Sequence, residues 1–215
     1  QVSIDGGTSW SNAISSVGSN TWSFATTLIG SITLAARVTN VNGSSTAYTQ
    51  AFILDTTAPT NTFSNLSFLP DTGTSNTDFI TNTASQTIKA TLNTGITGTD
   101  VVYGSLDNGA TWVNITSKLS GTSLSWSGVT LSSSSTLKLK VTDNAGNDGT
   151  IASQAYVLDT TAPTTTFGAL KLSLDTGSSS SDFITKTPAQ TITATLSSAP
   201  AGSDEVYGSL DNGAT

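Results

Sequence analysis

The sequence contains no cysteine, no histidine and no methionine. Without cysteine, the chain has neither a disulfide framework nor a thiol nucleophile. Without histidine, it has no His-based acid–base catalyst, no Ser-His-Asp triad and no ordinary zinc site. We therefore expect a protein that is not an enzyme. A hydrolase that uses two carboxylates is still compatible with the composition.

Charged residues are also scarce, at 10% of the chain, where about 25% is usual. Acids dominate: the net charge is −7, with thirteen Asp and a single Glu, Glu205. Such a chain is a poor partner for nucleic acid or an anionic membrane surface, and no apolar run is long enough to insert into a bilayer. A preference for Asp over Glu favours turns and cation-binding loops over helix surfaces.

What the chain does have is an internal repeat. Three motifs return at the same 104-residue step: FILDTTAPT around Asp55 and YVLDTTAPT around Asp159, DTGTSNTDFIT from Asp71 and DTGSSSSDFIT from Asp175, and VYGSLDNGAT from Val102 and from Val206. VSIDGGTSW near the N-terminus also matches GSLDNGATW in the middle of the chain. A fixed period near a hundred residues indicates a tandem array of small domains.

The period divides the chain into three parts. Residues 55–158 form one whole unit, residues 1–54 the second half of another, and residues 159–215 the first half of a third. We expect the chain to belong to a longer array in which neighbouring repeats are the first partners. The two half-units could also complete each other between molecules by head-to-tail self-association. The alternative is that both belong to one continuous longer chain.

Strand patterns run through the complete unit. Apolar residues alternate with polar ones at Ile88, Ala90 and Leu92 and again at Leu137, Leu139 and Val141, and no convincing amphipathic helix is present. Asn108-Gly109 is a strong hairpin signal because both residues tolerate positive φ. About seven strands in a unit of this length predict an all-β fold of tandem immunoglobulin-like β-sandwich domains in an extended array. We expect the tryptophans, Trp126 above all, to be core residues rather than sugar platforms.

The ordered set LDTTAPT, DTGxSxxDFIT, GSLDNGATW and VTDNAGNDG resembles the bacterial Ig-like repeats of giant secreted adhesins. Those proteins leave the cell by type I secretion and act in biofilm formation and host attachment. The resemblance implies an extracellular, cell-surface rod of sandwiches that holds a distant adhesive tip, with Ca²⁺ near the domain junctions. The alternative function is a binding module whose repeats contact a glycan or a protein directly.

The resemblance also implies a set of calcium ligands in three motifs. These candidates are Asp55, Asp71, Asp78, Asp143, Asn147, Asp148, Asp159, Asp175 and Asp182. Ca²⁺ takes six to eight oxygens, which Asp and Asn side chains and backbone carbonyls on loops can supply. In a sandwich of this order, the VTDNAGND loop should lie near Asp55 and the DTG loop near Asp159.

The competing interpretation is that Asp and Asn only form turns here. We adopt it for Asp107 and Asp211, because hairpin geometry explains DNG. The N-terminal part reads VTNVNGSS, so that Asn40 replaces Asp143 and no acid matches Asp148. A calcium site on that loop is expected to be weak or missing.

Overall fold

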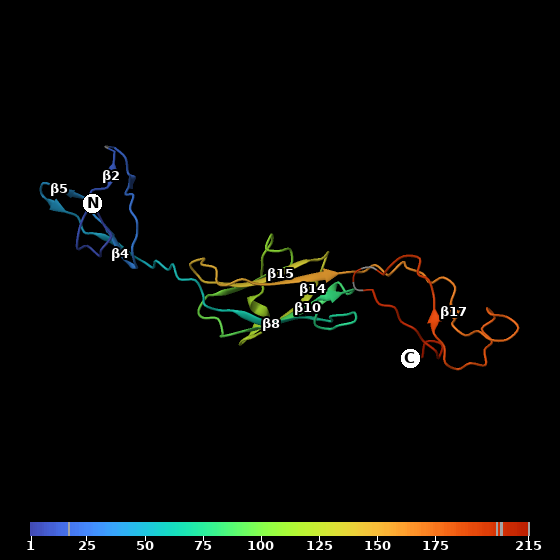
Figure 1. Cartoon of the computed structure of the whole chain (residues 1–215). Coiled ribbons are helices and arrows are strands. Elements are labelled where there is room, and N and C mark those ends of the chain that lie inside the picture. The colour runs from blue at the N-terminus through green and yellow to red at the C-terminus, as the bar shows by residue number, and fades with distance from the viewer. Residues whose placement is uncertain (17, 201, 203, 215) are drawn as a thin grey trace. The chain divides into compact units, whose positions relative to one another are not determined.

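A computed structural model describes residues 1–16, 18–200, 202 and 204–214 and is all-β (Figure 1). The single helical element in the part described is a 3₁₀ turn, η1 (Thr116–Lys118). No helix in these residues has the length and apolar character needed to cross a membrane. The chain divides into two compact units, Gln1–Asp159 and Thr160–Thr215.

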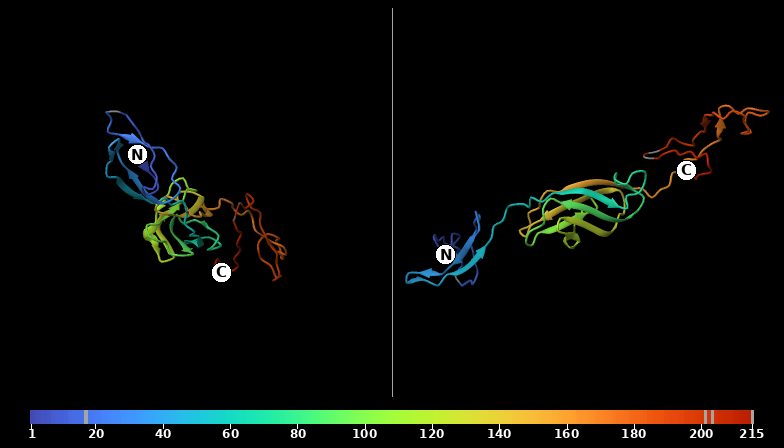
Figure 2. Two further views of the ribbon diagram at one scale, coloured as in Figure 1. Left: turned by 90° about the vertical axis from the view of Figure 1, so that its left-hand side faces the viewer. Right: turned by 90° about the horizontal axis from the view of Figure 1, so that it is seen from below.

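Residues 55–158 are all described and form two facing sheets, which Figures 1 and 2 show as two layers. The first sheet has the order β13-β14-β10-β8 and the second β12-β11-β15-β16-β9. The strands are β8 (Phe63–Leu69), β9 (Ile80–Thr81), β10 (Ser85–Leu92), β11 (Val101–Ser105), β12 (Val113–Asn114), β13 (Leu119–Ser120), β14 (Ser123–Thr130), β15 (Ser135–Thr142) and β16 (Ala152–Leu158). The unit thus has nine strands, where the sequence suggested about seven, because three of them are only two residues long.

The core lies between the two sheets and comes from the alternating positions. Ile88, Ala90 and Leu92 on β10 and Leu137, Leu139 and Val141 on β15 are buried, as their alternation predicts. Trp126 on β14 belongs to the same cluster, which confirms its expected core position. Gly104 on β11 makes room for it, because a Cβ at Gly104 would lie 2.4 Å from the Trp126 ring.

The N-terminal segment, residues 1–54, keeps part of this plan. Its three-stranded sheet has the order β1-β4-β7, accompanied by the pairs β2-β3 and β5-β6. The strands are β1 (Val2–Ser3), β2 (Ile14–Ser15), β3 (Trp22–Ser23), β4 (Ile32–Ala36), β5 (Thr39–Asn40), β6 (Gly43–Ser44) and β7 (Tyr48–Phe52). In sequence, β1, β4 and β7 correspond to β11, β15 and β16, which also pair in that order.

The C-terminal segment, residues 160–214, keeps a complementary part. β17 (Lys171–Leu172) pairs with β18 (Ile192–Thr193), with Leu172 opposite Ile192. One repeat earlier, Phe68 lies opposite Ile88 in the β8–β10 ladder. The register of this strand pair is therefore the same in both copies.

Candidate metal centre

The loop of residues 143–148, here called the entry loop, contacts the segment through which the chain enters the central unit. Asp143 Oδ1 accepts hydrogen bonds from the backbone N–H groups of Ala145 and Asn147 at 2.8 and 2.9 Å, and Asp143 Oδ2 accepts one from Asn147 Nδ2 at 2.8 Å. The bond from the Asn147 side chain is the main reason that the pKa of Asp143 is lowered. Asn147 Nδ2 also donates to the Asp55 carbonyl oxygen at 3.1 Å. The structure thus brings Asp55, Asp143 and Asn147 together.

Asp148 uses its carboxylate differently. Its Oδ2 atom accepts a hydrogen bond from Lys140 Nζ at 2.6 Å, which is also an ion pair, and its Oδ1 atom accepts one from Thr142 Oγ1 at 2.6 Å. These bonds lower the pKa of Asp148, the Lys140 bond most. The sequence analysis missed Lys140 as a partner, although the alternation along β15 places it on the solvent-facing side.

The loop of residues 71–82, here called the exit loop, holds an unpaired carboxylate oxygen. Asp71 Oδ2 accepts a hydrogen bond from the Phe79 N–H at 3.0 Å, whereas Asp71 Oδ1 is buried and has no hydrogen-bond partner. Asp78 Oδ1 accepts a bond from the Ile80 N–H at 3.0 Å. Phe79 has φ = 63°, a conformation that a bulky side chain rarely adopts. A buried carboxylate oxygen without a donor needs a cation or a water molecule nearby.

The same loop recurs in the C-terminal segment. Asp175 Oδ2 accepts from the Phe183 N–H at 3.0 Å, Asp182 Oδ1 accepts from the Ile184 N–H at 3.1 Å, and Phe183 has φ = 61°. Asp175 Oδ1 is again buried without a partner. Since this segment buries much less apolar surface than the central unit, the geometry of the loop is encoded locally.

Two threonines also shape this loop, and the sequence analysis missed them. Thr72 Oγ1 and Thr81 Oγ1 lie 2.8 Å apart and share a hydrogen bond. Their counterparts, Thr176 and Thr185, do the same at 3.2 Å. Both threonines recur at the repeat period, which is the signal that could have revealed them.

The exit loop also holds the chain where it leaves the central unit. Val157 N–H donates to Phe79 O at 2.9 Å and Asp159 N–H donates to Thr81 O at 3.0 Å, beside the parallel pair β16–β9. As expected, Asp159 lies next to the exit loop and Asp55 lies next to the entry loop. The seven-residue strand β16 runs from one loop to the other, so the two ends of the unit are roughly 20 Å apart or more along this strand.

The two loops differ in how well they suit a metal ion. The described residues include no group of three or more His, Cys, Asp or Glu side chains placed to hold one. In the entry loop, both oxygens of Asp143 and both of Asp148 accept hydrogen bonds. In the exit loop and its repeat, Asp71 and Asp175 each keep one buried oxygen unpaired. Ca²⁺ prefers such oxygens, so the exit loop suits it better.

In the N-terminal segment, the counterpart of the entry loop folds as a short hairpin. Asn40 Oδ1 accepts a hydrogen bond from the Asn42 N–H at 2.8 Å, as Asp143 does from Ala145. Asn40 pairs with Gly43 in β5–β6, and its amide carries no negative charge. The turn survives the substitution, but the charge that would attract a cation does not.

Asp107 organises a hairpin turn. Its Oδ1 atom accepts from Ser105 Oγ at 2.7 Å, and its Oδ2 atom accepts from Thr111 Oγ1 at 2.5 Å. The Thr111 side chain is the largest cause of the lowered pKa of Asp107, about 2. Asn108 and Gly109 have φ = 60° and 91°, the conformation that the DNG signal predicts.

No protein-family model matches the chain, and no curated protein is similar enough to count as a match.

Proposed function

We propose that the chain is an extracellular extension region of a large bacterial surface adhesin, built as a calcium-stiffened rod of Ig-like repeats that supports cell adhesion or biofilm formation. The observation that carries this proposal is the position of the two ends of the central unit. Asp55 contacts the entry loop and Asp159 contacts the exit loop, at opposite ends of β16. Units joined in this way add their lengths, which is what a spacer needs.

The Ig-like character of the unit is supported by its sheet topology. β10 pairs with β14 and β11 pairs with β15, so the chain crosses between the two sheets instead of forming only sequential hairpins. Apart from the short parallel pair β16–β9, the strand pairs of the unit are antiparallel. Two such sheets with crossings between them are typical of immunoglobulin-like sandwiches. The tandem arrangement is supported by the β8–β10 register, which recurs as β17–β18.

Calcium is proposed at the loops that join one unit to the next. At the exit loop, Asp71 and Asp78 would bind the ion together with oxygens near Asp159, and Asp175 and Asp182 would do so one repeat later. At the entry loop, Asp55, Asp143, Asn147 and Asp148 are the candidates, and there the ion would compete with Lys140 for Asp148. Extracellular calcium modules bind at ~10⁻⁴–10⁻³ M, and a hundred-fold excess over Kd stabilises a folded protein by about 2.7 kcal/mol.

The experiment compares the melting temperature and the small-angle scattering of the chain in EDTA and in millimolar Ca²⁺. We expect a higher Tm in calcium, a smaller calcium effect for Asp71→Asn, and an undiminished effect for Asp107→Asn, whose carboxylate belongs to a turn. Identical Tm values and maximum dimensions in the two buffers would refute the calcium part of the proposal.

The alternative function, direct binding by the repeats, makes a different prediction. A glycan array and a pull-down from host-cell extract with the whole chain should then give a saturable ligand. For an extension region, we expect neither assay to give a signal above a control protein of similar charge.

A further inference from the structure

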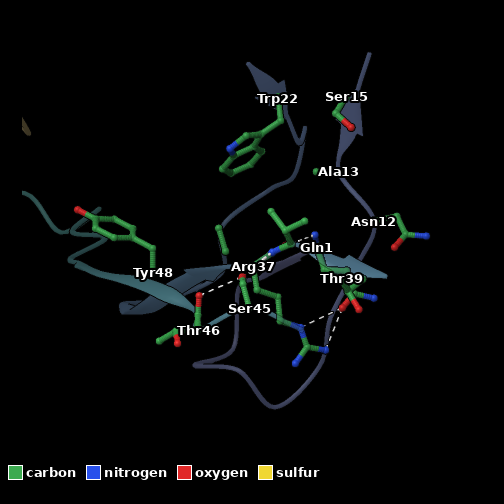
Figure 3. Close-up of a pocket in the computed structure, with 12 residues that line it drawn as sticks. Gln1, Asn12, Ala13, Ser15, Trp22, Arg37, Thr39, Ser45, Thr46 and Tyr48 are labelled. Carbon is green, nitrogen blue, oxygen red and sulfur yellow. Dashed lines mark hydrogen bonds between the residues drawn. The ribbon is translucent and has the colours of Figure 1, made fainter. Parts of the chain in front are cut away.

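An open cavity of about 530 Å³ lies in the N-terminal segment, between β4 and the hairpin β2–β3 (Figure 3). Three of its lining residues have counterparts in the buried core of the central unit: Ala13, Trp22 and Val38 correspond to Ile115, Leu124 and Val141. Because these positions are buried in a complete repeat, we assign no ligand to this cavity.

The turn of residues 105–111 in the central unit contains a chemically reactive pair, Asn108-Gly109. Glycine has no side chain to keep its backbone nitrogen away from the preceding asparagine. Once that nitrogen loses its proton, it can attack Asn108 Cγ. The Cγ–Nδ2 bond then breaks, ammonia leaves and a cyclic imide forms. Water adds to either carbonyl of the imide and opens the ring, so that Asn108 becomes aspartate or isoaspartate.

The Gly109 nitrogen is engaged in a hydrogen bond in this turn. Its N–H donates to Ser105 Oγ at 2.8 Å, and the Ser105 hydroxyl donates to Asp107 Oδ1 at 2.7 Å. Because the hydroxyl proton is committed to Asp107, the Ser105 oxygen meets Gly109 as an acceptor. Ser105 is only 1% exposed, so the bond lies away from water. The nitrogen must give up this bond before it can lose its proton and turn towards Asn108.

The same turn fixes the hairpin to the sheet. The Asn108 N–H donates to Thr136 O on β15 at 3.0 Å. An isoaspartate at this position would add a methylene group to the main chain between residues 108 and 109. The turn would become longer, and the hairpin β11–β12 would no longer keep this bond to β15 in its present geometry. Deamidation of Asn108 would therefore loosen the central unit at this edge.

We propose that Asn108-Gly109 is a latent deamidation site and that Ser105 suppresses the reaction by holding the Gly109 N–H. The equivalent bond joins the Gly7 N–H to Ser3 Oγ at 2.8 Å, in a turn where Gly6 takes the place of Asn108. The bond is therefore a feature of the turn itself, and it acquires a protective role where asparagine precedes the glycine.

The first test measures deamidation residue by residue in the whole chain. The unchanged chain, Ser105→Ala and Thr111→Val are kept in warm, mildly alkaline buffer, and their peptide digests are followed by mass spectrometry. Asn42-Gly43 is another Asn-Gly pair of the same chain and serves as the internal reference. Thr111→Val is the matched control, because it removes a hydrogen bond to Asp107 in the same turn and leaves the Ser105 hydroxyl in place.

We expect Ser105→Ala to raise the rate at Asn108, relative to Asn42, about ten-fold, which corresponds to about 1.4 kcal/mol of activation free energy. Thr111→Val should leave that ratio unchanged. Hydrogen exchange of the Gly109 N–H, followed by nuclear magnetic resonance, should accelerate in Ser105→Ala and not in Thr111→Val.

Two results would overturn the proposal. Equal rates at Asn108 in the unchanged chain and in Ser105→Ala would mean that the backbone geometry of the turn protects the asparagine without the serine. An equal rise in Ser105→Ala and Thr111→Val would mean that any loosening of the turn has the same effect.

A second measurement covers the case in which Ser105→Ala does not fold. The unchanged chain is incubated at urea concentrations below its unfolding transition. The deamidation rate at Asn108 should rise in proportion to the exchange rate of the Gly109 N–H, because both reactions require the same bond to open. A deamidation rate that stays constant while this exchange accelerates would contradict the role of Ser105.

Discussion

The central unit and the terminal segments share the repeated motifs and several turns and strand pairs, yet they have very different cores. The Leu158 N–H donates a hydrogen bond to Ser134 Oγ at 3.1 Å, and the Leu54 N–H donates the equivalent bond to Ser31 Oγ at 2.9 Å. The backbone hydrogen bonds that Asp71 and Asp78 accept in the exit loop recur at Asp175 and Asp182. Burial does not recur: Ile88 is fully buried and Ile192 half exposed. Turns and strand pairs are thus specified over short stretches of sequence, whereas the core requires both halves of the repeat.

A substitution in the buried core should separate the stability of the central unit from that of the terminal segments most strongly. Ile88→Ala should lower the free energy of unfolding of the central unit by about 2–5 kcal/mol, because it leaves a cavity between the two sheets. Urea unfolding followed by circular dichroism measures the loss. Ile192→Ala is the matched variant, and at concentrations where the chain is monomeric it should leave that transition unchanged. Equal losses at both positions would mean that the terminal segment has a core of its own.

The contact between Gly104 and Trp126 gives the next largest effect. Gly104→Ala should cost about 1–3 kcal/mol, because the new Cβ has no room beside the indole ring. Gly208→Ala should cost far less, since no atom lies within 4 Å of its Cβ position. Thermal unfolding of both variants tests this difference.

In the N-terminal segment, a larger residue at the glycine position is accompanied by a smaller aromatic ring at the tryptophan position. Val2 and Phe24 stand where the central unit has Gly104 and Trp126. The double variant Gly104→Val/Trp126→Phe should therefore be more stable than Gly104→Val alone. Additive losses in this double-mutant cycle would show that the two positions do not share space.

The response to acid should be smaller. Hydrogen bonds from Thr111 and Ser105 lower the pKa of Asp107 to about 2, below the roughly 3.9 of an unfolded chain. Its contribution to stability is therefore complete above about pH 4 and is lost as the pH falls towards 2. Asp107→Asn should flatten the decrease in Tm over this range. Asp5, whose pKa is also lowered to about 2, serves as the control, because Asp5→Asn should leave the central transition unchanged.

The smallest effect should come from the ion pair between Lys140 and Asp148. The carboxylate is half exposed, so Asp148→Asn should change stability in EDTA by only about 0–1 kcal/mol. The change should shrink further in 1 M salt. Thermal unfolding at low and high salt measures it. A loss that persists at high salt would point to the Thr142 hydrogen bond instead.

The contact between Lys140 and an aromatic ring is one feature that the sequence alone does not predict. The Lys140 ammonium group lies 4.5 Å from the centre of the Trp112 ring, and in the N-terminal segment Arg37 lies 3.9 Å from the centre of Trp10. Both tryptophans are half-buried beneath a cation. Neither contact could be predicted from alternation, because it joins positions that meet only when the hairpin folds back over its sheet.

The predictable parts of the fold are those with a local pattern. Alternation identified the buried faces of β10 and β15, and Asn108-Gly109 identified the turn, because both depend on neighbouring residues. The last strand was less clear. Ile151, just before it, and Val157 are each more than 40% exposed, whereas Tyr156 is buried. Its hydroxyl group donates to Leu106 O at 2.8 Å, a partner 50 residues away.

The candidate site was predictable in outline only. The motifs placed Asp159 beside the exit loop and Asp55 beside the entry loop, because sandwich topology fixes which ends of the strands meet. The spacing of the acids does not reveal that Asp148 turns to Lys140, or that Asp71 keeps one oxygen buried and unpaired. These depend on side-chain directions that arise only in the folded unit.

The short parallel pair β16–β9 decides how the central unit would respond to a pulling force. Tension applied at residues 55 and 159 drags β16 along its own axis, while β9 is held back through its connection to β8. The hydrogen bonds from Val157 to Phe79 and from Asp159 to Thr81 lie across that direction. These two hydrogen bonds are therefore loaded in shear. They must break together, whereas bonds pulled along their own direction would break one after another.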